Sequence, residues 1–276
     1  FPTRRKNLSA PSRLRGEKIN SVMFRPRVIP VLLLKGQGLV KSKQFKNHRY
    51  IGDPVNAVRI FNDLQADELI FLDILATKEK RTISTDFVKN VGEEANMPFA
   101  VGGGINSINQ IRQILHAGAE KVVLNTGAIH HPEFVRQAAD MFGSSTITIC
   151  IDVKKKFLGT EQVWTVGASK ATGKSPVSVA VEMEKQGAGE LIIQSIENDG
   201  MMQGYDIPLI RKISEAVTIP VVALGGAGTK IDFKQAIDEG YASAVAAGSM
   251  FVYHGPRNAV LVNYPTPEQL SELFMR

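Results

Sequence analysis

Three carboxylates lie where apolar, strand-length runs of the sequence end, and a carboxylate in such a position can transfer protons. Asp152 directly follows one run, Asp73 lies near the end of another, and Asp199 lies a few residues beyond a third. A well-placed general acid or base typically contributes about 10²–10⁴ in rate. For Asp73 and Asp199, capping of a loop by the side chain explains the residue equally well. We predict Asp152 and Asp199 as the catalytic carboxylates, and Asp73 is a further candidate.

Two glycine clusters, GGG at 102–104 and GGAG at 225–228, also follow strand-length runs, and a small polar pair follows each of them one run later. Glycine lets backbone N–H groups approach an anion closely, and the start of the following helix adds a favourable dipole. Because the arrangement occurs twice, it favours two phosphate sites over glycines that only relieve crowding in tight turns. The predicted phosphate-binding residues are Gly104, Asn125 and Thr126 in the first half and Gly225, Gly226, Gly248 and Ser249 in the second.

The elements that must position these residues alternate between strand-length apolar runs and segments of helical period, which is typical of βα units around a parallel sheet. Eight such units in about 240 residues fit a closed (β/α)₈ barrel better than an open sheet, and the loops after its strands build the active site. The predicted strands are 28–34, 69–74, 98–101, 121–125, 146–151, 190–194, 220–224 and 243–247. The predicted helices include 54–65, 108–116, 132–141, 177–186, 208–216 and 233–238.

The pattern repeats once at half length. In the first half FAVGGGI at 99–105 precedes GAEKVVLNT at 118–126, and in the second VVALGGAG at 221–228 precedes GYASAVAAGS at 240–249. An internal repeat of this kind indicates a duplicated structural unit. We predict an α/β fold, a TIM barrel built from two half-barrel repeats, which forms a single domain over residues 23–276.

Positive charge is concentrated at the start of the chain. The formal net charge is +6, and residues 1–22 contribute +5 of it, from six Lys or Arg against Glu17. The remainder is nearly neutral, so we expect no nucleic-acid partner, and no apolar run approaches membrane-spanning length. We expect the basic leader to be disordered or a non-native extension, with Met23 as the natural start.

The single cysteine, Cys150, excludes an intrachain disulfide and fits a reducing, cytoplasmic compartment. It lies in an apolar strand pattern, so we interpret it as buried filler. The five histidines show no zinc-ligand spacing. We therefore predict no metal and no other cofactor.

Several stretches resemble the cyclase subunit of imidazole glycerol phosphate synthase. They are DELIFLDI at 67–74, VGGGI at 101–105, GAEKV at 118–122 with NT at 125–126, and GAGE at 187–190. The likeness runs from about Arg27 to Phe251. It implies duplicated half-barrels, a heterodimer with a glutaminase subunit that supplies ammonia, and a lyase-type cleavage and cyclisation of a ligand with two phosphates.

The resemblance also carries over to individual positions. The family's flexible first-loop lysine matches Lys41, and its phosphate-binding glycines and polar pairs fall on the predicted phosphate residues. Its ammonia gate, at the opposite face of the barrel, matches Arg27, Glu68, Lys121 and Glu190. Alternating charges alone would suggest a structural ion-pair ring. A match of type and position in a family that channels ammonia favours retained ammonia handling.

The chain departs from this family in the catalytic pair. The family uses aspartates at the ends of the first and fifth strands, and Asp152 matches the second of these, whereas the first is Leu33. Leucine neither donates nor accepts a proton, so efficient cyclase chemistry is not expected. The segments PVLLLK at 30–35 and GSMF at 248–251 are similar to a branch associated with glycosyl amidation, which works with a glutaminase and a sugar amidotransferase in bacterial lipopolysaccharide biosynthesis.

Three hypotheses follow. The leading one is an ammonia-receiving barrel that serves amidation of a sugar. The first alternative is a genuine cyclase of histidine biosynthesis, in which a group such as Asp199 replaces the missing acid or base. The second is a non-catalytic module that binds a phosphorylated ligand.

Overall fold

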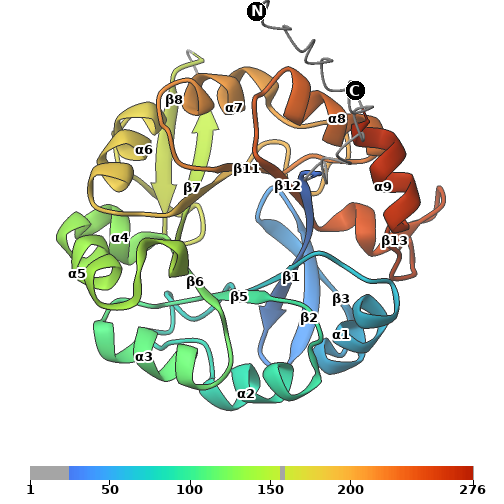
Figure 1. Ribbon diagram of the computed structural model, residues 1–276, viewed down its shortest axis with the longest axis horizontal. Helices are drawn as coiled ribbons and strands as arrows, with labels where there is room; N and C mark the ends of the chain where they lie inside the picture. Colours follow the sequence, from blue (N-terminus) through green and yellow to red (C-terminus); the bar gives the residue numbers. More distant parts are fainter. Residues whose placement is uncertain (1–24, 156–158, 276) are drawn as a thin grey trace, which may run out of the picture.

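The computed structural model describes residues 25–155 and 159–275, and its centre is a closed barrel of parallel strands (Figure 1). Each strand pairs in parallel with the next, and pairing of the last with the first closes the ring. The predicted eight-stranded TIM barrel is confirmed. In order round the ring its strands are β1 (Arg27–Lys35), β4 (Leu69–Asp73), β5 (Phe99–Gly102), β6 (Lys121–Leu124), β7 (Ile147–Lys155), β10 (Glu190–Ser195), β11 (Val221–Leu224) and β12 (Ala244–Ala247).

Helices form an outer ring around the barrel (Figure 1). The first helix begins at an Asp-Pro pair: the Asp53 side chain accepts the backbone N–H of Asn56, and Pro54 occupies the first turn. The helices between the barrel strands are α1 (Pro54–Asp63), α2 (Thr85–Glu94), α3 (Ile108–His116), α4 (Thr126–His130), α5 (Pro132–Phe142), α6 (Pro176–Lys185), α7 (Ile207–Ser214) and α8 (Lys230–Asp238). The sequence pattern misses α2, whose fully buried residues are only Val88 and Val91, and it starts α8 too late.

Two apolar cores follow from the alternation of side chains along the barrel strands. One lies between the barrel and the helices. The other fills the barrel interior, and Cys150 belongs to it, so the predicted burial of this cysteine is confirmed. Its Sγ also hydrogen-bonds Asp152, which the sequence does not predict. The buried interior residues are Ile29, Val31, Ile70, Ala100, Val123, Cys150, Ile192, Val222, Leu224, Ala244 and Ala246.

Antiparallel hairpins extend the first and fifth barrel strands. The segments β2 (Gly38–Lys43) and β3 (Lys46–Gly52) continue from β1, and β8 (Glu161–Thr165) and β9 (Lys170–Ala171) continue from β7. For this reason both barrel strands run beyond their predicted ends. Leu33 pairs with Val40 in one hairpin and Asp152 with Trp164 in the other. The two halves of the barrel therefore place Leu33 and Asp152 equivalently, as the internal repeat predicts.

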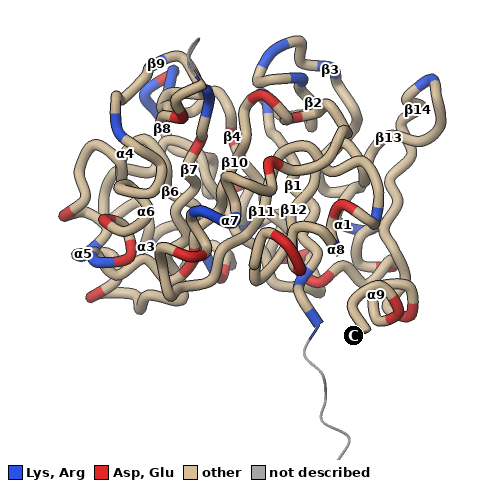
Figure 2. Tube along the Cα trace, turned by 90° about the horizontal axis from the view of Figure 1, so that it is seen from above, with Lys and Arg blue, Asp and Glu red and all other residues tan. Residues whose placement is uncertain are grey.

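Both hairpins project from the face at the C-terminal ends of the barrel strands (Figure 2). The small hairpin of β13 (Tyr253–His254) and β14 (Ala259–Val260) projects on the same side, whereas α9 (Pro267–Phe274) lies near the opposite face. The basic leader predicted at 1–22 lies outside the described residues. In the part of the chain that the structure describes, no helix combines the length and the apolar character needed to cross a bilayer.

Candidate functional site

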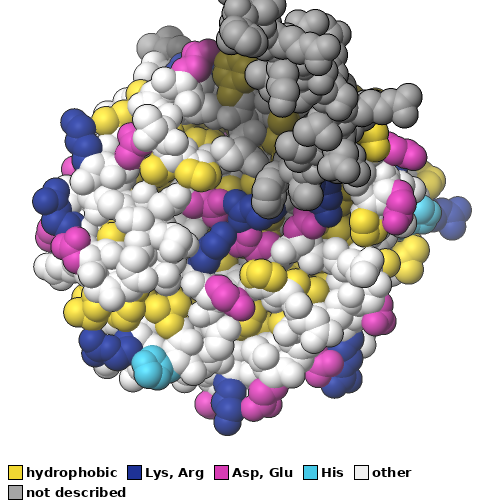
Figure 3. Space-filling view, viewed as in Figure 1, with side chains coloured by type: hydrophobic (Ala, Val, Ile, Leu, Met, Phe, Trp, Pro, Cys, Tyr) yellow, Lys and Arg dark blue, Asp and Glu magenta, His cyan; other side chains and the backbone are white. Residues whose placement is uncertain are grey.

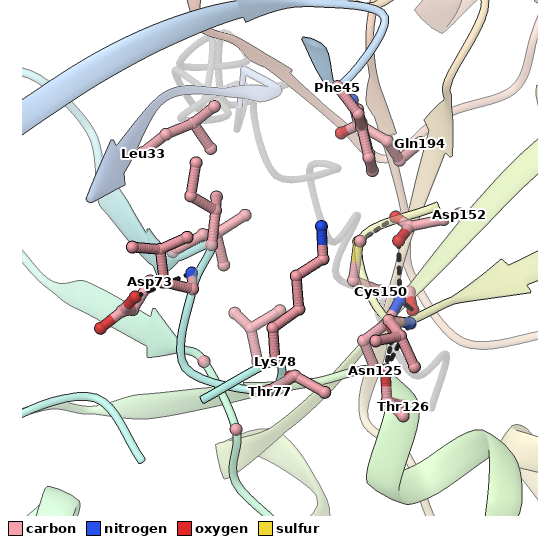
Figure 4. Close-up of a pocket in the computed structure, with 18 of the residues that line it drawn as sticks. Leu33, Phe45, Asp73, Thr77, Lys78, Asn125, Thr126, Cys150, Asp152 and Gln194 are labelled. Carbon is pink, nitrogen blue, oxygen red and sulfur yellow. Dashed lines mark hydrogen bonds between the residues drawn. The ribbon is translucent and has the colours of Figure 1, made fainter. Parts of the chain in front are cut away.

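A cavity of about 670 Å³ opens at the C-terminal ends of the barrel strands, where this fold places its active sites. It brings together Asp73, Asp152, Asp199 and Lys41, with Leu33 on its wall. Figure 4 shows Leu33 and Asp152 on opposite sides of the cavity, with Lys78 reaching between them. The structure thus gathers the residues proposed for catalysis into one space.

Asp152 is buried, and its environment favours the protonated form. Burial raises the pKa of this carboxyl to about 7, although hydrogen bonds from Cys150 and Asn125 oppose the shift. The Asn125 amide donates to Oδ2 at 3.1 Å and also to the carbonyl oxygen of Cys150 at 2.9 Å. A carboxyl with such a pKa can donate or accept a proton near neutrality.

Asp199 and Lys41 form a second polar group in the cavity. Asp199 accepts hydrogen bonds from Ser42 Oγ at 2.9 Å and Gln194 Nε2 at 3.0 Å, which join the loop after β10 to β2. Burial raises the pKa of Asp199, against the opposing effects of the Ser42 hydrogen bond and the Lys41 charge. Lys41 lies within β2 rather than in a flexible loop, and its Nζ donates to the carbonyl oxygen of Val31. Burial lowers the pKa of Lys41 to about 8.

Asp73, by contrast, braces its own loop. Its Oδ1 accepts the backbone N–H groups of Leu75 at 3.1 Å and Ala76 at 3.2 Å, and Arg81 forms an ion pair with it. Two capping bonds and an ion pair occupy this carboxylate, which agrees with loop capping. Asp73 therefore shapes the cavity without a free oxygen for proton transfer.

In the first predicted phosphate site, Gly104, Asn125 and Thr126 all line the cavity. Gly104 has φ +66°, and a Cβ there would lie 1.8 Å from the carbonyl oxygen of Arg81, so close packing of the loops also requires glycine. The Thr126 hydroxyl donates to Asn125 Oδ1 at 3.0 Å and accepts the Val166 N–H at 3.0 Å. Through Asn125, this site is connected to the Asp152 carboxyl.

The second predicted phosphate site is divided. Gly248 and Ser249 line the cavity, whereas Gly225 and Gly226 are buried beside it and pack loop against loop. A Cβ on Gly226 would lie 2.1 Å from the carbonyl oxygen of Gly204. A Cβ on Gly248 would lie 2.4 Å from Lys41 Nζ, so this glycine makes room for the lysine.

Sequence reasoning missed a set of basic side chains around the cavity. Lys78, Lys80 and Lys170 line it, and none forms an ion pair with a carboxylate among the described residues. Burial and the nearby Lys170 charge lower the pKa of His130 in the same wall. Lys78 and Lys80 lie in the loop after β4, Lys170 lies on β9 and His130 lies in α4. Their position after predicted strands indicates the C-terminal face of the barrel, but no periodic signal in the sequence shows which of them face the cavity. A mouth with unpaired cations favours an anionic ligand.

At the opposite end of the barrel, the four predicted gate residues form a closed ring of ion pairs. Arg27 pairs with both Glu68 and Glu190, and Lys121 Nζ lies 3.1 Å from Glu68 and 3.4 Å from Glu190. Figure 3 shows basic and acidic side chains gathered at the centre of this face. The two carboxylates are buried and the two cations are partly exposed. With two positive and two negative side chains, the ring at the N-terminal mouth of the barrel has no net charge.

No metal site accompanies these features in residues 25–155 and 159–275, where no group of His, Cys, Asp and Glu is arranged to hold an ion. The fold and site define a (β/α)₈-barrel protein with acidic and basic groups at the C-terminal face and an ion-pair ring at the other. The sequence profile of the family described as "Histidine biosynthesis protein" matches residues 27–256. The chain belongs to this family, as a HisF-like member.

Curated relatives support this assignment over most of the chain. A Leptospira borgpetersenii protein named "Putative imidazole glycerol phosphate synthase subunit HisF" is 44% identical over 91% of this chain and 100% of its own length. The Pseudomonas aeruginosa protein "Putative imidazole glycerol phosphate synthase subunit hisF2" is 42% identical over 90% and 99%. "Imidazole glycerol phosphate synthase subunit HisF" of Thermococcus onnurineus is 46% identical over 84% and 91%.

Proposed function

We propose that this chain is the ammonia-receiving barrel subunit of a glutamine amidotransferase complex, in which it forms a heterodimer with a glutaminase. Ammonia enters at the ring of Arg27, Glu68, Lys121 and Glu190 and leaves at the cavity. The observation that carries the proposal is the alignment of three features: a charge-balanced ring, an apolar barrel interior and a polar cavity. An apolar interior excludes water, so ammonia that crosses the barrel is kept away from solvent until it reaches the cavity.

The cavity serves a phosphorylated small-molecule ligand in this proposal. Unpaired lysines at its mouth and the Gly104, Asn125 and Thr126 site provide the charge and the geometry that a phosphate needs. Gly248 and Ser249 provide a second polar group on the far side of the cavity. The position of Gly225 and Gly226 outside the cavity lining makes this second site the weaker of the two.

We further propose that the ammonia serves amidation of a sugar for lipopolysaccharide biosynthesis, through a sugar amidotransferase. The support for this step is Leu33, which lies opposite Asp152 and can exchange no proton. Loss of one partner of an acid–base pair costs about 10²–10⁴ in rate. A barrel that retains its ring and loses half of its catalytic pair is better suited to delivering ammonia than to cyclising a substrate.

A measurement of glutamate release by a HisH-like glutaminase from the same organism tests the proposal. Adding the chain should raise glutamate release within the range of about 5–150-fold that allosteric coupling typically spans. The two proteins should also co-purify. No stimulation by the folded chain, together with no co-purification, would overturn the proposal.

A cyclase of histidine biosynthesis is the first alternative, and the burial of Asp199 beside Lys41 in the same cavity favours it. Complementation separates the two functions. A histidine auxotroph that lacks its cyclase should not grow when it expresses this chain at normal levels. Growth would establish the cyclase and refute sugar amidation as the sole role.

A non-catalytic ligand-binding module is the second alternative. It predicts that Asp152→Asn leaves turnover of the assembled complex unchanged. We expect a loss of turnover, because the cavity raises the pKa of this carboxyl toward neutrality.

A further inference from the structure

The hydroxyl of Thr148 is buried in the barrel without a hydrogen-bond partner in the described structure. Thr148 is only 1% exposed, and its Oγ1 forms no hydrogen bond. It lies on β7 two residues before Cys150, which belongs to the interior core, whereas Ile147 and Ile149 pack against the helices. Side chains alternate along a strand, so Thr148 points into the barrel.

The strand register places Thr148 next to the ion-pair ring. Its Cα pairs with that of Glu190, a ring residue, on one side and with that of Val123 on the other. Around the barrel, its height is shared by inward-pointing residues from alternate strands, which form one interior layer. These are Ile29, Ala100 and Val222, all apolar.

Packing alone does not explain a threonine at this position. Valine has nearly the same shape and would fill the space without a buried polar group. Buried hydroxyls in proteins almost always have a partner, and an exception calls for a bound molecule or a function. Thr148 has the one hydroxyl in the described interior between the ring and the cavity, and the small Ala100 side chain shares its layer.

We propose that the Thr148 hydroxyl is a binding station for a single ammonia molecule that has just passed the ring. This inference rests on the proposed function, since it assumes that ammonia uses the barrel interior. The hydroxyl can donate to the lone pair of ammonia and can accept one of its N–H groups. Thr148 is then a positioning residue, which holds the molecule in an otherwise apolar passage until it moves to the cavity.

Methyl NMR on the complete chain tests the station directly. The Ile29 methyl lies in the same layer and serves as the reporter, and the probe is ammonium chloride at alkaline pH, where part of it is free ammonia. Trimethylammonium chloride at the same pH and ionic strength controls for salt and size. Thr148→Val removes the hydroxyl at constant shape, and Thr148→Ser retains it. Thr172→Val, at a site outside the barrel, is the matched control.

The wild-type chain, Thr148→Ser and Thr172→Val should show a saturable shift of the Ile29 methyl with ammonia and none with trimethylamine. In Thr148→Val the half-saturating concentration should rise about two- to tenfold, as expected for one lost hydrogen bond. An unchanged response in Thr148→Val, or no response in the wild type, would overturn the station. Neither result depends on the glutaminase, whose stimulation tests the proposed function separately.

Discussion

Asp152 and Leu33 occupy equivalent positions in the two halves of the barrel but differ completely in chemistry. Each lies where a barrel strand begins to pair with its hairpin. Leu33 lies on one wall of the cavity, packed against the apolar interior core, and Asp152 lies on the opposite wall with a raised pKa. Of the two equivalent positions in the duplicated barrel, therefore, one has an acid–base group and the other has a leucine.

The raised pKa of Asp152 predicts a pH dependence of stability. The carboxyl titrates near 3.8 in the unfolded chain and at about 7 in the native one, so the native state binds more protons between these values. Its contribution is fully present below about pH 4 and is lost as the pH rises through 7. Asp152→Asn removes this loss. The free energy of unfolding of the variant relative to wild type should rise by on the order of 2–4 kcal/mol between pH 4 and pH 8.

Urea denaturation at several pH values measures this difference, because the titration of groups that do not interact with Asp152 cancels between the two proteins, and Asp199 and Cys150 are the groups that do interact with it. A difference that stays constant from pH 4 to pH 8 would show that Asp152 keeps an ordinary pKa. It would also remove one of the arguments for acid–base work at this position.

Gly248→Ala tests the environment of Lys41. The added Cβ would lie 2.4 Å from Lys41 Nζ, at the far end of a flexible side chain, so the lysine should move rather than the barrel. Outside its buried site, Lys41 should recover a pKa close to 10.5 from its present value of about 8. NMR titration of the labelled lysine measures the shift, and urea denaturation should show a loss of stability below about 1 kcal/mol. An unchanged pKa would mean that the barrel yields instead.

At the scale of elements, the sequence predicts what hydrophobic burial determines. The barrel strands are continuous apolar runs because both faces are buried, and each is recognisable within a few residues of its true ends. The hairpins are not, since β3 is mostly exposed and reads KNHRYIG without alternation. The cavity lysines, such as Lys78, were missed for a related reason: a loop residue leaves no periodic signal, and only the fold shows that it faces the cavity.

The glycine loops illustrate how packing and ligand binding can place the same demand on a sequence. Gly104 and Gly36 share a left-handed backbone, with φ +66° and +64°, but only Gly104 has a neighbour within reach of a Cβ. Gly36→Ala should cost only the strain of that conformation, about 1 kcal/mol. Gly104→Ala must also displace the backbone at Arg81 and should cost about 2–4 kcal/mol. Urea denaturation of both variants gives the difference, and equal losses would contradict this packing argument.

At the scale of the whole molecule, the ion-pair ring and the cavity lie at opposite ends of the barrel, with the apolar interior between them. The sequence contained the ring residues but not their contacts, because Arg27 and Glu190 are far apart along the chain and meet only when the barrel closes. The ion pairs of the ring also link β1, β6 and β10 at their N-terminal ends, so the ring can contribute to the stability of the barrel. A ring that admits ammonia must open, which limits how strongly it can stabilise the fold.

Two charge-removing variants measure how strongly the ring stabilises the fold. Lys121→Met leaves Glu68 and Glu190 with Arg27 as their only ring cation, and removing one partner of a buried pair is destabilising because the other charge stays buried. Since the Lys121 side chain is 23% exposed, solvent screening should hold the loss to about 1–2 kcal/mol. Adding Glu190→Gln restores the balance of charge and should recover most of it, as measured by urea denaturation. If Lys121→Met loses more than about 4 kcal/mol of unfolding free energy and Glu190→Gln does not restore it, the ring stabilises the fold too strongly to open for ammonia.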